Sequence, residues 1–66
     1  MTRAQLAATN RAIKALGGLT AVAERYDISI QAVQNWRKRG VPPGRVKAIA
    51  TDSGVPREKL LPDLYA

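Results

Sequence analysis

The sequence of 66 residues contains no cysteine and no histidine. Disulfide bonds and thiolate metal sites are therefore excluded, and so is the side chain that most often acts as an acid–base catalyst near neutral pH. No apolar run approaches the roughly 18 residues that a membrane-spanning helix needs, and residues 1–8 lack the apolar segment of a secretory signal. We therefore expect a cytoplasmic protein that contacts no membrane and needs no metal or other cofactor.

Acidic residues are scarce, since five Asp and Glu stand against eleven Lys and Arg and give a formal net charge of +6. The carboxylates are scattered singly, and no nucleophile, glycine-rich phosphate loop or metal-ligand spacing accompanies them. We therefore expect neither an enzyme nor a small-molecule ligand. A sequence pI near 10.6 is instead typical of domains that bind nucleic acid.

Much of the positive charge lies between Asp27 and Asp52, a stretch that contains no acid. This distribution predicts a local binding site for a polyanion. A basic face that serves only solubility is the alternative explanation. The cations of this stretch are Arg37, Lys38, Arg39, Arg45 and Lys47.

The pattern of apolar residues favours an all-α fold, because period-2 alternation is absent and helix-forming residues are abundant. Glycine, proline and capping residues divide the chain into one domain, residues 1–66, built as a compact bundle of about five short helices. Ser29 is an expected N-cap, and Gly17 and Gly40 are expected just beyond helix ends. The expected helices span 2–16, 19–26, 30–39, 43–54 and 57–61.

The helix expected over 30–39 has two distinct faces when its residues are placed at about 100° per step. Val33 and Trp36 share the apolar side, so Trp36 is expected in the core rather than as a stacking platform. Arg37 and Arg39 lie on the flanks. Amide and lysine side chains of this kind pair with adenine and guanine edges in the major groove, although any soluble helix exposes similar groups. The opposite side carries Gln31, Gln34, Asn35 and Lys38.

Residues 19–38 resemble the bacterial helix-turn-helix motif. The motif has a small residue on its first helix, an apolar residue after the turn and two apolar residues on its second helix. One departure is Asp27, where the family usually has glycine, but Asp tolerates a positive φ better than most residues. The four motif positions are occupied by Ala23, Ile28, Val33 and Trp36.

A wider segment, from Ala12 to Tyr65, resembles the small Cro-like or YdaS-like regulators of phages and prophages. The resemblance rests on the strings GGLTAVAERYDISIQAVQNWRKRG, VPPGRVKAIA and KLLPDLY. It implies a lambda-repressor-like DNA-binding architecture and a transcriptional repressor of the Cro type. Such a repressor is a homodimer, at least on DNA, and reads a palindromic double-stranded operator in the major groove with helix 30–39.

The resemblance also assigns roles along the motif. The base-reading positions fall on Ser29, Gln31, Gln34, Asn35 and Lys38. The positions expected to bind phosphates are Gly18, Thr20, Arg37, Arg39 and Arg45. For Gly18 and Thr20 the alternative is simple punctuation between two helices.

A different class of function remains open beside DNA binding. A protein-interaction module, such as an antitoxin or antirepressor, would use the same basic surface to meet an acidic partner. An apolar patch near the end of the chain would serve such a partner or self-association, or would instead complete the core of so small a domain. Its residues are Leu60, Leu61, Leu64 and Tyr65.

Overall fold

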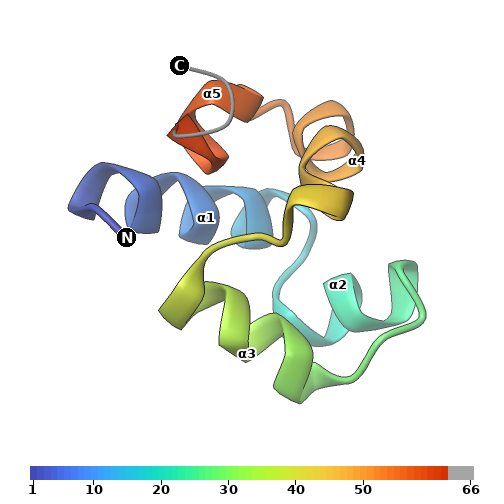
Figure 1. The fold of residues 1–66 in the computed structure, drawn as a ribbon. Coiled ribbons are helices and arrows are strands. Elements are labelled where there is room, and N and C mark those ends of the chain that lie inside the picture. The colour runs from blue at the N-terminus through green and yellow to red at the C-terminus, as the bar shows by residue number, and fades with distance from the viewer. Residues whose placement is uncertain (63–66) are drawn as a thin grey trace.

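The computed structural model describes residues 1–62, and this part of the chain forms five α-helices and no strand (Figure 1). The all-α bundle expected from the sequence is confirmed, and the helix ends lie within one residue of the expected ones. Within the described residues, no helix is both long enough and apolar enough to cross a membrane. The helices are α1 (Arg3–Ala15), α2 (Leu19–Arg25), α3 (Ile30–Arg39), α4 (Pro43–Ser53) and α5 (Arg57–Leu60).

Local hydrogen bonds explain where the helices begin and end. The Thr2 hydroxyl accepts a bond from the Gln5 amide at 3.0 Å and so caps the start of α1. After α1 the chain turns at Gly17, whose φ of 104° confirms the expected left-handed residue. The Gly18 amide then donates to the Ile13 carbonyl at 2.9 Å. These short-range bonds make the boundaries of α1 readable from the sequence.

Helix α1 runs through the middle of the molecule, with α4 and α5 on one side and α2 and α3 on the other (Figure 1). All five helices contribute to one apolar core. Trp36 is only 4% exposed, which confirms its expected place in the core. Leu60 is fully buried and Leu61 half-buried, whereas Leu64 and Tyr65 lie outside the described residues. The largest fully buried apolar side chains are Val22, Val33, Val46, Ile49 and Leu60.

Two polar residues in the first half of α1 are buried, which the sequence did not indicate. Thr9 is fully buried, and its hydroxyl donates to the Gln5 carbonyl one turn earlier at 2.9 Å. The Gln5 side chain reaches the turn after α3, where a Cβ on Gly40 would lie 2.9 Å from Gln5 Nε2. Gly40 has a φ of 91°. This close approach fixes the end of α3 against α1.

Candidate nucleic-acid interface

Helices α2 and α3 are joined by a tight turn whose backbone bonds are specific. The Ile28 amide donates to the Ala23 carbonyl at 2.9 Å, and the Asp27 amide donates to the Glu24 carbonyl at 3.3 Å, as in a Schellman motif. Asp27 has a φ of 53°, so it adopts the left-handed conformation for which related motifs use glycine. The Ser29 hydroxyl then accepts from the Ala32 amide at 3.1 Å and caps α3, as expected. The turn therefore sets the angle at which α3 leaves the body.

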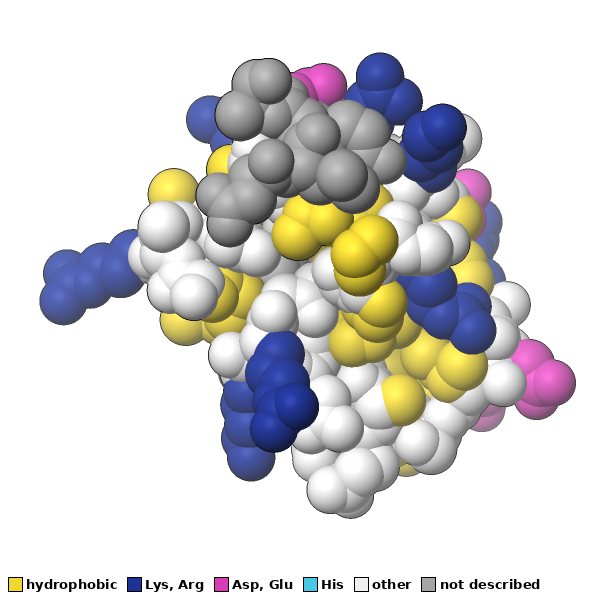
Figure 2. Space-filling model, in the orientation of Figure 1, with side chains coloured by type: hydrophobic (Ala, Val, Ile, Leu, Met, Phe, Trp, Pro, Cys, Tyr) yellow, Lys and Arg dark blue, Asp and Glu magenta, His cyan; other side chains and the backbone are white. Residues whose placement is uncertain are grey.

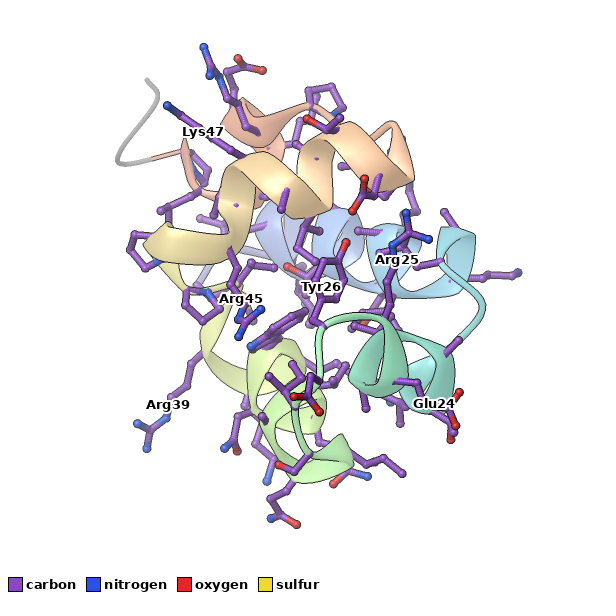
Figure 3. All side chains as sticks on the ribbon, turned by 90° about the vertical axis from the view of Figure 1, so that its right-hand side faces the viewer. Glu24, Arg25, Tyr26, Arg39, Arg45 and Lys47 are labelled. Atoms are coloured by element: carbon purple, nitrogen blue, oxygen red, sulfur yellow. The ribbon has the colours of Figure 1, made fainter. Side chains whose placement is uncertain are left out.

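Helix α3 has one buried and one exposed face. Val33 is fully buried and Trp36 nearly so, which confirms the apolar side predicted from the helical period. The polar residues expected on the other side are all exposed, and the part of α3 that carries them forms one end of the molecule in Figure 3. Base reading by these residues stays a prediction. They are Gln31, Gln34, Asn35 and Lys38, with Ser29 exposed at the N-cap.

The two arginines on the flanks of α3 have different surroundings. Arg37 is exposed, and its Nε donates to the Asn10 side-chain oxygen on α1 at 3.2 Å. Arg39 is also exposed, and its side chain extends away from the body of the protein (Figure 3). Arg37 is therefore aimed by α1, whereas Arg39 is free to follow a ligand.

Two open hollows lie between α1 and α3, and Asn10 and Arg37 line both of them. The larger hollow, of about 500 Å³, brings Gly18 and Arg37 together, two of the residues expected to bind phosphates. It also contains Lys14, an exposed cation that sequence reasoning did not assign. Its lining is Asn10, Ile13, Lys14, Gly17, Gly18, Leu19 and Arg37.

The smaller hollow, of about 360 Å³, borders the exposed face of α3. Gln34 and Lys38 line it from α3, and Leu6 and Asn10 line it from α1. Lys14 stands four residues after Asn10, so the two share a face of α1. This spacing is the sequence signal that would have indicated a contribution of α1 to the site. Thr20 is exposed but lines neither hollow.

Arg45, on α4, lies apart from these hollows. Its guanidinium carbon is 5.9 Å from the centre of the Tyr26 ring, at a cation–π distance (Figure 3). The Tyr26 hydroxyl donates to the Asp52 carboxylate at 2.6 Å, and Arg25 Nε donates to the same oxygen at 3.4 Å. These contacts tie the end of α2 to α4. We name the group of Arg25, Tyr26, Arg45 and Asp52 the α2–α4 link.

The ionisable groups of the α2–α4 link perturb one another. The hydrogen bond from Tyr26 is the main cause that lowers the pKa of Asp52 below its ordinary value. Burial, followed by the bond to Asp52, raises the pKa of Tyr26. The bond to Asp52 also raises the pKa of Arg25. The carboxylate and the neutral phenol are therefore the forms that coexist around neutral pH.

The positive charge does not form the single patch that its place in the sequence suggested. Figure 3 shows Lys47 and Arg39 at opposite ends of the molecule, and Figure 2 shows Lys and Arg side chains at several separate places. The reason is the turn after Gly40, which reverses the chain between α3 and α4. Only Arg37, Lys38 and Arg39 gather on one element. Within residues 1–62, no three acidic side chains come together as a metal site would require.

The family model for the bacterial toxin YdaS matches residues 9–66, which include all of α2, α3, α4 and α5. The chain belongs to the YdaS family. This confirms the YdaS-like part of the resemblance, while a Cro-like role for this YdaS-family protein stays a prediction. No curated protein and no solved structure matches the chain.

Proposed function

We propose that this YdaS-family protein is a sequence-specific double-stranded DNA-binding transcriptional repressor that inserts α3 into the major groove. One observation carries the proposal: α3 exposes amides and cations but no acid, while Val33 and Trp36 anchor its other side in the core. An α-helix about 10–12 Å across matches the width of the major groove of B-DNA. The α2 helix and its tight turn supply the brace that such a helix needs.

The side chains on the exposed face of α3 match the chemistry of base edges. Gln31, Gln34 and Asn35 can donate and accept together, as adenine N6 and N7 require. Lys38 donates only, and guanine O6 and N7 only accept. Ser29 begins the series at the N-terminal end of the helix. The proposed base-reading set therefore covers both kinds of base pair.

Phosphate binding is proposed for the residues that border this face. Arg37 and Gly18 line the larger hollow together with Lys14, so a backbone phosphate there would meet two side-chain cations. Arg39 would reach the opposite strand from the other flank. Thr20 stands exposed in the first turn of α2. Arg45 would need to leave the Tyr26 ring to contribute.

A homodimer is part of the proposal, because a single α3 contacts too few base pairs to specify one site in a genome. Two α3 helices related by a twofold axis would enter successive major grooves about 34 Å, or about 10 base pairs, apart. The dimer contact is expected in the C-terminal half, including Leu64 and Tyr65, which lie outside the described residues. Deleting residues 62–66 and measuring the molecular mass in solution, with and without DNA, tests this contact.

Selection of bound sequences from a pool of random DNA duplexes tests the proposed function directly. We expect enrichment of an inverted repeat with half-sites about 10 base pairs apart. Lys38→Gln and Lys47→Gln form a matched pair, since each removes one positive charge but Lys47 lies at the far end of the molecule from Arg39. Lys38→Gln should weaken binding to the selected site and Lys47→Gln should not. Failure to enrich any sequence, or equal effects of both variants, contradicts the proposal.

The name of the family supports a second candidate, inhibition of bacterial growth. A repressor that binds host promoters would itself be toxic, so the two functions are compatible. Induced expression of the wild type and of Lys38→Gln in bacteria, followed by growth curves, separates the mechanisms. Growth inhibition that disappears with Lys38→Gln indicates DNA as the target. Inhibition that persists with a variant unable to bind DNA favours the protein-interaction alternative, an antitoxin-like or antirepressor-like module with an acidic partner.

A further inference from the structure

Ile30 is an apolar side chain left in solvent at the start of α3. Its surface is 44% exposed, and among residues 1–62 only Met1 is another exposed large hydrophobic residue. The inward position before the helix is taken by Ile28, which packs against the core. Ile30 is therefore not needed to fill the core, and its exposure costs the protein solvation free energy without an evident structural return.

The position of Ile30 places it within the exposed polar face rather than beside it. At about 100° per residue, Ile30 lies about 40° from Gln34 and about 20° from Arg37 around the helix axis. These three residues form one row along the side of α3 that borders the smaller hollow. Ile30 occupies the N-terminal end of this row, the part of a recognition helix that contacts base edges.

The backbone at Ile30 is held firmly. Ser29 Oγ accepts from the Ala32 amide at 3.1 Å, and the Ser29 carbonyl accepts from the Val33 amide at 3.3 Å. A β-branched side chain in a helix has one strongly preferred rotamer. The Ile30 side chain therefore projects in a nearly fixed direction, as a residue that discriminates between bases requires.

We propose that Ile30 is a specificity-determining residue that packs against the C5-methyl group of a thymine in each half-site. This inference rests on the proposed DNA binding by α3 and adds one base preference to it. The thymine methyl is the apolar group that base edges present in the major groove, and cytosine, adenine and guanine have none there. Contact with it would remove from water both the methyl and the exposed surface of Ile30.

Replacement of thymine by deoxyuridine tests the contact, because it deletes the methyl and keeps every hydrogen-bonding group. The probe is the site selected by the wild type, with each thymine replaced in turn. We expect one position per half-site at which the wild type loses about fourfold in affinity, the value for one buried methyl-sized group. With Ile30→Ala, the thymine and deoxyuridine duplexes should bind equally at that position.

The matched control is Gln31→Ala, which changes the neighbouring exposed residue and should retain the fourfold loss at that thymine. Thermal unfolding should show little change in Tm for Ile30→Ala, because the side chain is largely outside the core. A deoxyuridine effect that Ile30→Ala leaves intact, or no effect at any thymine, overturns the inference while the proposed function stands. Failure of the wild type to bind DNA removes the proposed function as well, and appears before any variant is used.

Discussion

Gln34 stands in the middle of the exposed face of α3, about 40° from Lys38 and about 60° from Gln31 around the helix axis. A central amide is the least able to swing away from a base edge. We therefore expect Gln34→Ala to weaken binding to the selected site by about 1–3 kcal/mol and to relax the preference at one base pair per half-site. Gel-shift titrations on the selected site and on random duplexes measure both effects.

Val33→Ala is the control for that experiment, because Val33 lies one residue away on the buried side. It removes methyl groups from the core, so it should lower Tm and leave the base preference of the folded protein unchanged. Equal losses of specific and non-specific binding with Gln34→Ala would show that Gln34 does not read a base and that the proposed register of α3 is wrong.

Gly40 is a second position where one residue has a large expected effect. Its φ of 91° and ψ of 168° belong to a region that only glycine populates readily, and a Cβ there would crowd Gln5 Nε2 at 2.9 Å. We expect Gly40→Ala to reduce the free energy of unfolding by about 1–3 kcal/mol, measured by chemical denaturation. Gly44→Ala is the matched control, since Gly44 lies in α4 with nothing within 4 Å of an added Cβ. It should be neutral or stabilise the protein by up to about 1 kcal/mol, and a loss as large as that of Gly40→Ala would contradict this explanation.

At the scale of elements, the α2–α4 link makes the hold on α2 dependent on pH. Asp52 has a lowered pKa in the folded protein, so its contribution to stability is present above its unfolded pKa of about 3.9 and is lost as pH falls through the folded value. Tyr26 has a raised pKa, so its contribution is present below about 10 and is lost as pH rises through the folded value. The link is therefore complete between these two limits.

Tyr26→Phe removes the hydroxyl of the link and keeps the ring beside Arg45. We expect it to lower Tm at pH 7 and to have a smaller effect at pH 2, where Asp52 is protonated. Thermal unfolding followed by circular dichroism at both pH values measures the difference. Asp27→Asn, which changes an acid outside the link, should show no such dependence on Tyr26. An effect of Tyr26→Phe that is equal at pH 2 and pH 7 would show that the charged carboxylate does not matter.

The helices and their ends were predictable because their causes are local. Ser29 caps α3 through a residue three positions away, and Gly40 ends it through its own φ. The contacts that aim the site were not predictable, because the Arg37–Asn10 bond joins residues 27 apart in the sequence. Such bonds depend on how α1 crosses α3, which the helical period does not specify. The same reason explains the misplaced charge of Lys47, since proximity in the sequence does not survive the turn between α3 and α4.

For the whole molecule, DNA binding is expected to depend strongly on salt. The α3 cations Arg37, Lys38 and Arg39 would make about six phosphate contacts in a dimer and release the corresponding counterions. Affinity should therefore fall roughly a thousandfold between about 50 and about 200 mM salt, as measured by gel shift. Arg39→Ala should weaken binding to all sequences alike and reduce the slope by about one unit per subunit contact. A flat salt response would remove the electrostatic basis of the proposal.

The burial of Trp36 gives the protein an internal optical probe. The chain has a single tryptophan, which is 4% exposed and lies on the side of α3 that faces away from the proposed DNA contact. Its fluorescence should be blue-shifted and shielded from iodide in the folded state, and should shift to the red on unfolding. Because DNA would approach from the opposite side, binding should leave this emission largely unchanged. Tryptophan fluorescence therefore separates variants that fail to fold from variants that fold and fail to bind.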